Sequence, residues 1–208
     1  MYSFLQYGII ICIERRVFMY DYITIERKYG SGGHEIAKKL AKKLGYRLYD
    51  RGVVEQTCKK MGLSYEEVAN MDEQTPIKPI FKTPGIDYTT IAEKIYNTEA
   101  DIIKEAAEQP GCVFVGRCAS EILKDKKCLK VFITADDDYR MDRSINVENN
   151  PADKADEVMK KFDKKREKFF TTHSGGKWGS PEYFDLIINS ANMDEDSIVA
   201  MLEGAAKA

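Results

Sequence analysis

The fold of this chain is decided near its start, where residues 23–37 read ITIERKYGSGGHEIA. A short apolar stretch comes first, then a glycine-rich segment, and then apolar residues at helical spacing. We interpret this order as a strand, a tight turn and a helix, which is the layout of a phosphate-binding loop. Gly30, Gly32 and Gly33 allow the backbone to turn so that successive N–H groups point into one concavity. The stretch therefore predicts a phosphate site at the start of the helix.

The same stretch lacks two side chains of the standard P-loop. That loop ends in a lysine that reaches the β- and γ-phosphates and a serine or threonine that holds Mg²⁺. Gly33 occupies the lysine position here, and His34 occupies the hydroxyl position. Lys28 and Arg27 precede the loop and can supply a cation from the other side, and His34 can donate one N–H to a phosphate. A tight turn without a ligand is the alternative interpretation, and the nearby basic residues favour the phosphate site.

The length and composition fit one domain, and the balance of charges gives no global preference for polyanions. The chain has 208 residues, of which 43% are hydrophobic, and 32 basic residues stand against 34 acidic ones, for a net charge of -2. We therefore expect neither nucleic acid nor a membrane as a partner, and the oligomeric state stays open. Five scattered cysteines without a CxxC motif indicate free thiols in a reducing cytoplasm. With only two histidines, we assign no metal ligands.

Residues 1–18 are predicted to form an extension that precedes a single domain at 19–208. Their apolar run, residues 4–13, is too short to span a membrane. It also lacks the basic start and the cleavage site of a signal peptide. An additional edge strand or a contact with a partner is the alternative interpretation of this segment.

Apolar, β-branched stretches without alternation predict strands that are buried on both faces of a parallel sheet. They lie at residues 22–25, 46–49, 112–115, 129–133 and 184–188. Helical spacing and three capping boxes, which begin at Ser64, Thr90 and Thr134, predict helices between the strands. Loops are expected at 74–84 and 171–181. The alternation of strands and helices predicts a three-layer α/β sandwich with a central parallel sheet.

Taken together and in order, several segments resemble the cytidylate kinase-like family, which belongs to the nucleoside monophosphate kinases of the P-loop NTPase fold. The segments are ITI with YGSGG at 23–33, LYDR at 48–51, VGRCA at 115–119, LKVFITA at 129–135, DKKR at 163–166 and YFDLIIN at 183–189. The resemblance covers residues 20–202. It implies acceptor-binding helices at about 50–105, a lid at about 136–180, and the use of ATP and Mg²⁺.

The resemblance also implies roles for individual residues. Asp50 matches the acidic residue that faces the acceptor nucleotide, and Arg117 matches the arginine that holds the acceptor's phosphate. Asp185 matches an acidic residue near the acceptor base or ribose. The implied catalytic cations are Lys28, Arg117, Arg140, Arg143 and Arg166. The implied donor-phosphate residues are Gly30, Ser31, Gly32, Gly33, His34 and Glu35, and the implied acceptor residues are Asp50, Arg51, Arg117 and Asp185.

Several of these residues also have a purely structural interpretation. Arg117 can belong to a structural salt bridge, and the aspartates near Arg140 and Arg143 can simply neutralise these arginines. His173 is expected in an exposed loop. Trp178 is expected to pin its loop to the surface, with stacking on a base as the alternative.

A second departure from the family pattern follows Arg117, where Cys118 stands in the place of an aspartate. Asp50 and Glu26 are possible substitutes for that metal-facing carboxylate. We interpret Cys118 as a small buried thiol, and a thiol with a lowered pKa beside Arg117 is the alternative. The prediction from the sequence is a nucleotide kinase that transfers the ATP γ-phosphoryl group to a nucleoside monophosphate such as CMP or dCMP. The alternatives are a P-loop protein that binds a nucleotide or phosphorylated ligand without transfer, and a kinase for another small acceptor.

Overall fold

The computed structural model describes residues 20–71 and 90–207. The extension predicted at 1–18 and the loop predicted at 74–84 lie outside these residues. No helix in the described ranges is both long enough and apolar enough to span a bilayer.

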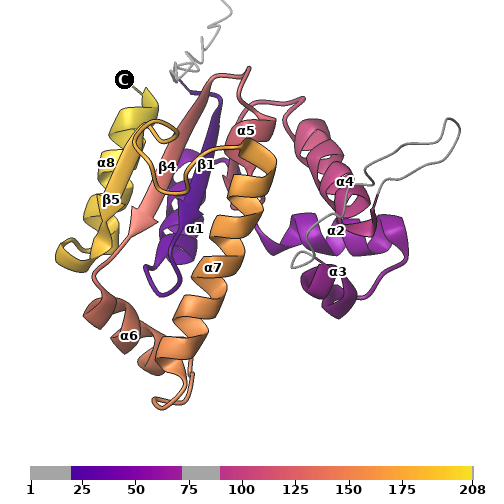
Figure 1. The fold of residues 1–208 in the computed structure, drawn as a ribbon. Coiled ribbons are helices and arrows are strands. Elements are labelled where there is room, and N and C mark those ends of the chain that lie inside the picture. Colours follow the sequence, from indigo (N-terminus) through magenta and orange to yellow (C-terminus); the bar gives the residue numbers. More distant parts are fainter. Residues whose placement is uncertain (1–19, 72–89, 208) are drawn as a thin grey trace, which may run out of the picture.

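A five-stranded sheet forms the centre of the molecule, in the order β2-β3-β1-β4-β5 (Figure 1). All neighbouring strands are parallel. The strands are β1 (Tyr22–Arg27), β2 (Arg47–Tyr49), β3 (Cys112–Val115), β4 (Cys128–Thr134) and β5 (Leu186–Asn189). Every strand predicted from the sequence is present, although β5 begins at Leu186 rather than at Phe184. The three-layer fold with a central parallel sheet is therefore confirmed.

The strand order creates a crevice between the carboxyl ends of β1 and β3. These two strands are neighbours, but the chain leaves β1 toward β2 and leaves β3 toward β4, on opposite sides. In open α/β sheets, ligands bind at such a switch point, outside the carboxyl ends of the strands. The glycine-rich segment follows β1 directly and so lies at this edge.

Helices cover both faces of the sheet. They are α1 (Gly33–Leu44), α2 (Arg51–Met61), α3 (Tyr65–Met71), α4 (Ile91–Ala106), α5 (Ala119–Ile122), α6 (Asp137–Asn146), α7 (Ala155–Ser174) and α8 (Glu195–Lys207). A 3-10 turn at Ser190–Asn192 follows β5. In Figure 1, α1 and α8 lie behind the sheet, and α7 crosses in front of it toward α5.

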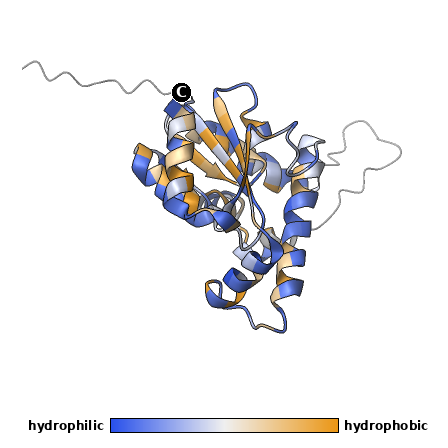
Figure 2. Cartoon of the chain, turned by 90° about the vertical axis from the view of Figure 1, so that its left-hand side faces the viewer, coloured by the Kyte–Doolittle hydropathy of each residue, from blue (hydrophilic) through white to orange (hydrophobic). Residues whose placement is uncertain are grey.

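The apolar character of the strands follows from burial on both faces. Ile23 and Ile25 of β1 pack into a core with residues of α1 and α8. Tyr22, which precedes Ile23 and so points to the opposite face, packs with residues of α2, α4 and α5. Figure 2 shows the strands as mostly hydrophobic, whereas the helices mix hydrophilic and hydrophobic residues. Neither face of β1 is left to water, which explains why the sequence does not alternate.

Two of the three predicted capping boxes are present. Thr90 and Glu93 form the complete reciprocal box at the start of α4. At the start of α3, the backbone of Ser64 donates to the Glu67 carboxylate at 2.7 Å and the backbone of Glu67 donates to Ser64 Oγ at 3.2 Å. The box predicted at Thr134 is wrong, because Thr134 still pairs with Asn189 in the sheet and Asp136 precedes α6 instead.

The loop predicted at 171–181 differs from the structure at the end of α7. The loop expected from residue 171 begins later, because α7 continues to Ser174 and ends at Gly175, which has a φ of 70°. His173 therefore lies in the last turn of α7 and not in an exposed loop. Its ring stacks on Tyr96 of α4, with 3.6 Å between the centroids. The prediction for His173 is wrong.

Candidate active site

The loop between β1 and α1 presents unused backbone N–H groups. Gly30 and Gly32 have φ values of 73°, in the left-handed region that favours glycine. Gly32 precedes α1 without a side-chain hydrogen bond to the first turn. Within residues 20–71 and 90–207, no group accepts from the N–H groups of Gly33, His34 and Glu35. Free N–H groups and the positive end of the helix dipole together favour an anion such as phosphate.

The loop is held closely by its surroundings. Ser31 folds back on Lys28, whose carbonyl accepts from the Ser31 backbone at 3.3 Å and from Ser31 Oγ at 2.8 Å. Ser190 Oγ donates to the Ser31 carbonyl at 2.7 Å. A Cβ at Gly30 would lie 2.6 Å from the backbone oxygen of Arg140, so only glycine fits there. The loop conformation is therefore set by backbone packing rather than by side chains that must rearrange.

Arg27, the last residue of β1, runs directly beneath the start of α1. A Cβ at Gly33 would lie 2.6 Å from Arg27 Cβ and 3.0 Å from Arg27 Cγ. A Cβ at Gly116, just after β3, would meet Arg27 Nη1. The guanidinium group therefore lies between the carboxyl ends of β1 and β3, in the crevice that the strand order creates.

Asp50 joins this cluster from the end of β2. Its Oδ1 lies 3.9 Å from Arg27 Nη2, and its Oδ2 lies 2.6 Å from His34 Nδ1. The side chain of His34 is 48% exposed, whereas that of Asp50 is mostly buried. Two residues predicted for opposite substrates, His34 for the donor and Asp50 for the acceptor, are thus brought into direct contact.

Arg166 of α7 lies on the inner side of the same cluster. It donates through Nη1 to the Arg27 carbonyl at 3.0 Å. Burial and the neighbouring positive charge of Arg27 lower the pKa of Arg166 to about 9. The two guanidinium groups carry the same charge and repel each other, so an anion that binds between or beside them would stabilise both.

Glu26 is buried near the end of β1, next to Arg27. It is 4% exposed, and Trp178 Nε1 donates to its Oε2 at 3.4 Å. Burial raises the pKa of Glu26, and the positive charge of Arg27 partly opposes that effect. Trp178 also packs edge-on against Phe132, with 5.0 Å between the ring centroids. The prediction that Trp178 pins its loop is confirmed.

Replacing Glu26 by glutamine is expected to raise the melting temperature at pH 7.5, because glutamine resembles the protonated acid that burial favours. Because the pKa of Glu26 is raised in the folded state, the folded protein binds a proton at Glu26 more tightly than the unfolded chain does. The stability of the wild type therefore falls as pH rises from 4.5, the ordinary pKa, through the raised pKa of the folded state. The advantage of Glu26→Gln should therefore disappear below pH 4.5. Thermal unfolding across this pH range measures the difference. A constant difference at every pH would contradict the explanation.

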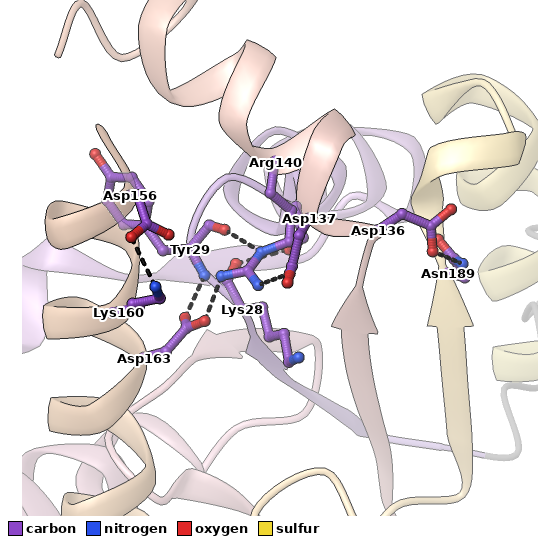
Figure 3. A network of polar contacts seen from close by, with 10 residues as sticks. Lys28, Tyr29, Asp136, Asp137, Arg140, Asp156, Lys160, Asp163 and Asn189 are labelled. Atoms are coloured by element: carbon purple, nitrogen blue, oxygen red, sulfur yellow. Dashed lines mark hydrogen bonds and ion pairs between the residues drawn. The ribbon is translucent and has the colours of Figure 1, made fainter. Parts of the chain in front are cut away.

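Arg140 is the centre of a polar network outside the loop, shown in Figure 3. It is 3% exposed and donates through Nε to the Tyr29 carbonyl at 2.8 Å. Its two other nitrogens pair with Asp137 and with Asp163. Asp163 of α7 also accepts from the Tyr29 backbone at 2.7 Å. Arg140 thus fixes α6, α7 and the loop to one another, and aspartates neutralise it, as the structural interpretation predicts.

Lys28 lies at the edge of that network without joining it. Its backbone N–H donates to the Ile133 carbonyl at 2.9 Å. Figure 3 shows its ammonium group pointing away from Arg140 and Asp163. Among the residues that the structure describes, none pairs with this ammonium group. Among the predicted catalytic cations, Lys28 therefore differs from the four arginines, whose side chains contact other described residues.

Arg143 of α6 lies beside the loop and is held by two carboxylates. Its Nη2 lies 3.3 Å from Glu35 Oε2, and its Nη1 lies 3.5 Å from Glu195 Oε1. Its Cζ would be 3.4 Å from a Cβ at Gly32. Arg143 is thus brought beside the loop, and its ion pair with Glu35 holds it there.

Arg117 follows β3 in a strained backbone conformation. It has a φ of 56°, and the next residue, Cys118, has a φ of 53°. Arg117 Nη1 lies 3.2 Å from Glu99 Oε1, and Glu99 is fully buried in α4. Its guanidinium carbon lies 5.5 Å from the ring centroid of Phe169. Both contacts fix the direction of the guanidinium group at the end of β3.

Cys118 itself is inert in this environment. It is fully buried, and burial raises the pKa of its thiol, an effect that the charge of Glu26 strengthens. The alternative of a lowered thiol pKa beside Arg117 is wrong, and the small buried thiol is the correct interpretation.

Two predicted acceptor residues lie apart from the cluster's contacts. Arg51 is the first residue of α2 and is exposed. Asp185 precedes β5, and its carboxylate accepts from the Lys130 backbone at 2.8 Å. The loop follows the end of β1, whereas Asp185 stands at the beginning of its strand, so the structure does not bring the two together.

The side chains of the described residues do not by themselves form a Mg²⁺ site. In the described part of the chain, no three His, Cys, Asp or Glu residues are grouped so that they could hold a metal ion. Mg²⁺ is commonly held by one or two carboxylates together with substrate phosphates and water. Asp50 is the carboxylate beside the loop that fits this mode, whereas buried Glu26 faces Trp178.

Comparison with known proteins agrees with this geometry. The model of the cytidylate kinase-like family matches residues 22–192. The cytidylate kinase of Archaeoglobus fulgidus is 30% identical over 185 residues, which cover 86% of this chain and 91% of that protein. The cytidylate kinase of Sulfurisphaera tokodaii is 25% identical over 182 residues, or 87% of this chain and 92% of that protein.

Solved structures support the same fold. An uncharacterized protein from Eubacterium ventriosum superposes with a TM-score of 0.70 at 27% identity, covering 90% of this chain and 98% of the other. Shikimate kinase from Bacteroides thetaiotaomicron superposes with a TM-score of 0.56 at 16% identity, covering 88% of this chain and 96% of the other. That second likeness concerns the fold alone, which is that of a P-loop kinase. With the family model matched from β1 to the turn after β5, the chain belongs to the cytidylate kinase-like family.

Proposed function

We propose that this protein is a nucleotide kinase that transfers the γ-phosphoryl group of ATP to a nucleoside monophosphate, with CMP and dCMP as the first acceptors to test. The observation that carries the proposal is the anion site at the carboxyl ends of β1 and β3, where free N–H groups of α1 meet several arginines. Phosphoryl transfer depends mainly on positioning and on cations that stabilise the charge of the transferred group. Family membership supports the same assignment.

The residues would divide the work between donor and acceptor. The N–H groups of Gly33, His34 and Glu35 bind donor phosphate oxygens, and Arg143 adds positive charge beside them. Arg117, with its direction fixed by Glu99, holds the acceptor's phosphate. An arginine can grip a phosphate through two parallel hydrogen bonds.

Asp50 is the carboxylate available to Mg²⁺ at this site, and His34 positions it through their shared contact. When bound with the nucleotide, Mg²⁺ neutralises charge on the phosphate oxygens.

The test is turnover with a panel of acceptors. Purified protein is mixed with ATP, Mg²⁺ and one of CMP, dCMP, UMP, AMP or GMP, and ADP release is followed. We expect turnover with CMP or dCMP above the rate without acceptor, within the range of about 1–100 s⁻¹ that is usual for kinases. Binding of ATP without turnover on any acceptor would favour the alternative of a nucleotide-binding protein.

A further inference from the structure

The spacing of the loop shows an exchange of two residues. In the P-loop motif GxxxxGK, a glycine opens the loop and a lysine follows the last glycine. With Gly32 as the last glycine, Gly33 takes the lysine position and Arg27 takes the position of the opening glycine. The small residue and the cation have therefore changed places across the loop.

The geometry explains why the two changes occur together. A Cβ at Gly33 would lie 2.6 Å from Arg27 Cβ and 3.0 Å from Arg27 Cγ, which is too close for both side chains to exist. Any side chain that starts at position 33 would begin where the stem of Arg27 passes. The two positions share one volume, so the site holds one long cationic side chain, and it comes from β1 instead of α1.

The charges around Arg27 leave it able to bind an anion. Its ion-pair partner among the described residues is Asp50, at the long distance of 3.9 Å, and the buried carboxylate of Glu26 also attracts it; the side chain of Arg27 is 18% exposed. The neighbouring Arg166 carries the same charge, and each opposes the other. An arginine fork can hold two phosphate oxygens, whereas a lysine acts as a point charge. These features distinguish Arg27 from Lys28, whose ammonium group points away from Arg140 and Asp163.

We propose that Arg27 is the cation that binds the donor phosphates, in the place of the absent loop lysine. This assignment rests on the proposed function, since it names a residue for the donor site of that reaction. The stem of Arg27 passes under Gly33, and its guanidinium group lies beside Gly116 in the crevice between β1 and β3. The first turn of α1 then supplies N–H groups and Arg27 supplies the positive charge.

The first experiment removes the charge and keeps the stem. Arg27→Gln is compared with wild type for ATP binding by isothermal titration and for turnover. We expect the dissociation constant for ATP to rise roughly 10- to 100-fold, as for the loss of hydrogen bonds to a charged group. We expect turnover to fall by about 10²-fold or more. Lys28→Ala is the competing variant, and we expect a smaller loss of ATP affinity for it.

The second experiment restores the standard arrangement. Gly33→Lys alone should unfold at a lower temperature and bind ATP poorly, because the new side chain collides with Arg27. Arg27→Gly alone should lose affinity because the cation is gone. The double variant Arg27→Gly/Gly33→Lys should bind ATP more tightly than either single variant, since one cation again occupies the shared volume.

The outcomes separate this assignment from the proposed function. ATP binding by wild type with unchanged affinity in Arg27→Gln would overturn the assignment alone. So would a larger loss in Lys28→Ala than in Arg27→Gln, or a double variant that binds no better than its single variants. Absence of ATP binding by wild type would overturn the proposed function, and the assignment with it.

Discussion

Replacing Gly30 by alanine is expected to lower the free energy of unfolding by about 2–5 kcal/mol and to abolish nucleotide binding. Two costs add at this position. Its φ of 73° is unfavourable for any residue with a Cβ, and the new Cβ would lie 2.6 Å from the Arg140 backbone oxygen. A Cβ is fixed to its own backbone, and the Arg140 oxygen is a backbone atom of α6, so no side-chain rotation can relieve the contact. The loop or α6 must move instead. Movement of the loop displaces the N–H groups that form the anion site.

The matched control for this variant is Gly45→Ala, at the other end of α1. Gly45 has a φ of 71°, but no atom lies within 4 Å of its added Cβ. We expect it to cost only about 1–2 kcal/mol, from the backbone conformation alone, with nucleotide binding preserved. Urea unfolding and ATP titration of both variants measure the comparison. Equal losses of stability would show that the close approach of Arg140 contributes nothing.

Replacing Arg117 by methionine is expected to have a comparably large effect on stability. Glu99 is fully buried, and Arg117 Nη1 lies 3.2 Å from its Oε1. Removing one member of a buried ion pair leaves a charge in a medium of low polarity, which costs about 3–5 kcal/mol. The same change should raise the KM for the acceptor, because Arg117 is assigned to the acceptor's phosphate.

The double variant Arg117→Met/Glu99→Gln separates these two effects. Neutralising Glu99 removes the buried charge, so most of the lost stability should return. Acceptor binding should not return, because the guanidinium group is still missing. Unfolding in urea and the KM for CMP are the two measurements. Recovery of both would mean that Arg117 acts only as the partner of Glu99.

The fold was predictable because its strongest signals are local. Burial of the central strands on both faces produces apolar, β-branched runs, and each run became a strand. The failures occur where distant pairing overrides a local signal. Thr134 begins a good capping pattern, but pairing with Asn189 keeps it in β4. His173 lies among turn-forming residues, but its stacking on Tyr96 accompanies the continuation of α7. Helix α2 has too few buried positions to show as a clear stripe, and its boundaries were not predicted.

The candidate site was predicted in position but not in its pairings. The loop and the arginines after β3 and β4 follow from sequence order in a parallel sheet. The partners of Arg117 and Arg143 come from other helices, and spacing along the chain cannot identify them. Arg140 pairs with Asp163 of α7 but also with Asp137 of its own helix, a contact that spacing along the chain does indicate. From the sequence, Arg27 was named beside Lys28 as a possible cation for the loop, but only Lys28 was predicted to be catalytic, although the exchange of arginine and glycine across the loop is visible in the sequence.

One face of α7 carries three contacts to the loop region. Phe162 stacks on Tyr29 with 4.9 Å between ring centroids, Asp163 accepts from the Tyr29 backbone, and Arg166 holds the Arg27 carbonyl. The spacing of these residues places all three on one side of the helix. Helix α7 therefore holds the loop region through a ring contact and two hydrogen bonds that share one side of the helix. A displacement of α7 would disturb the Asp163 and Arg166 contacts together, which couples the position of the helix to that of the loop.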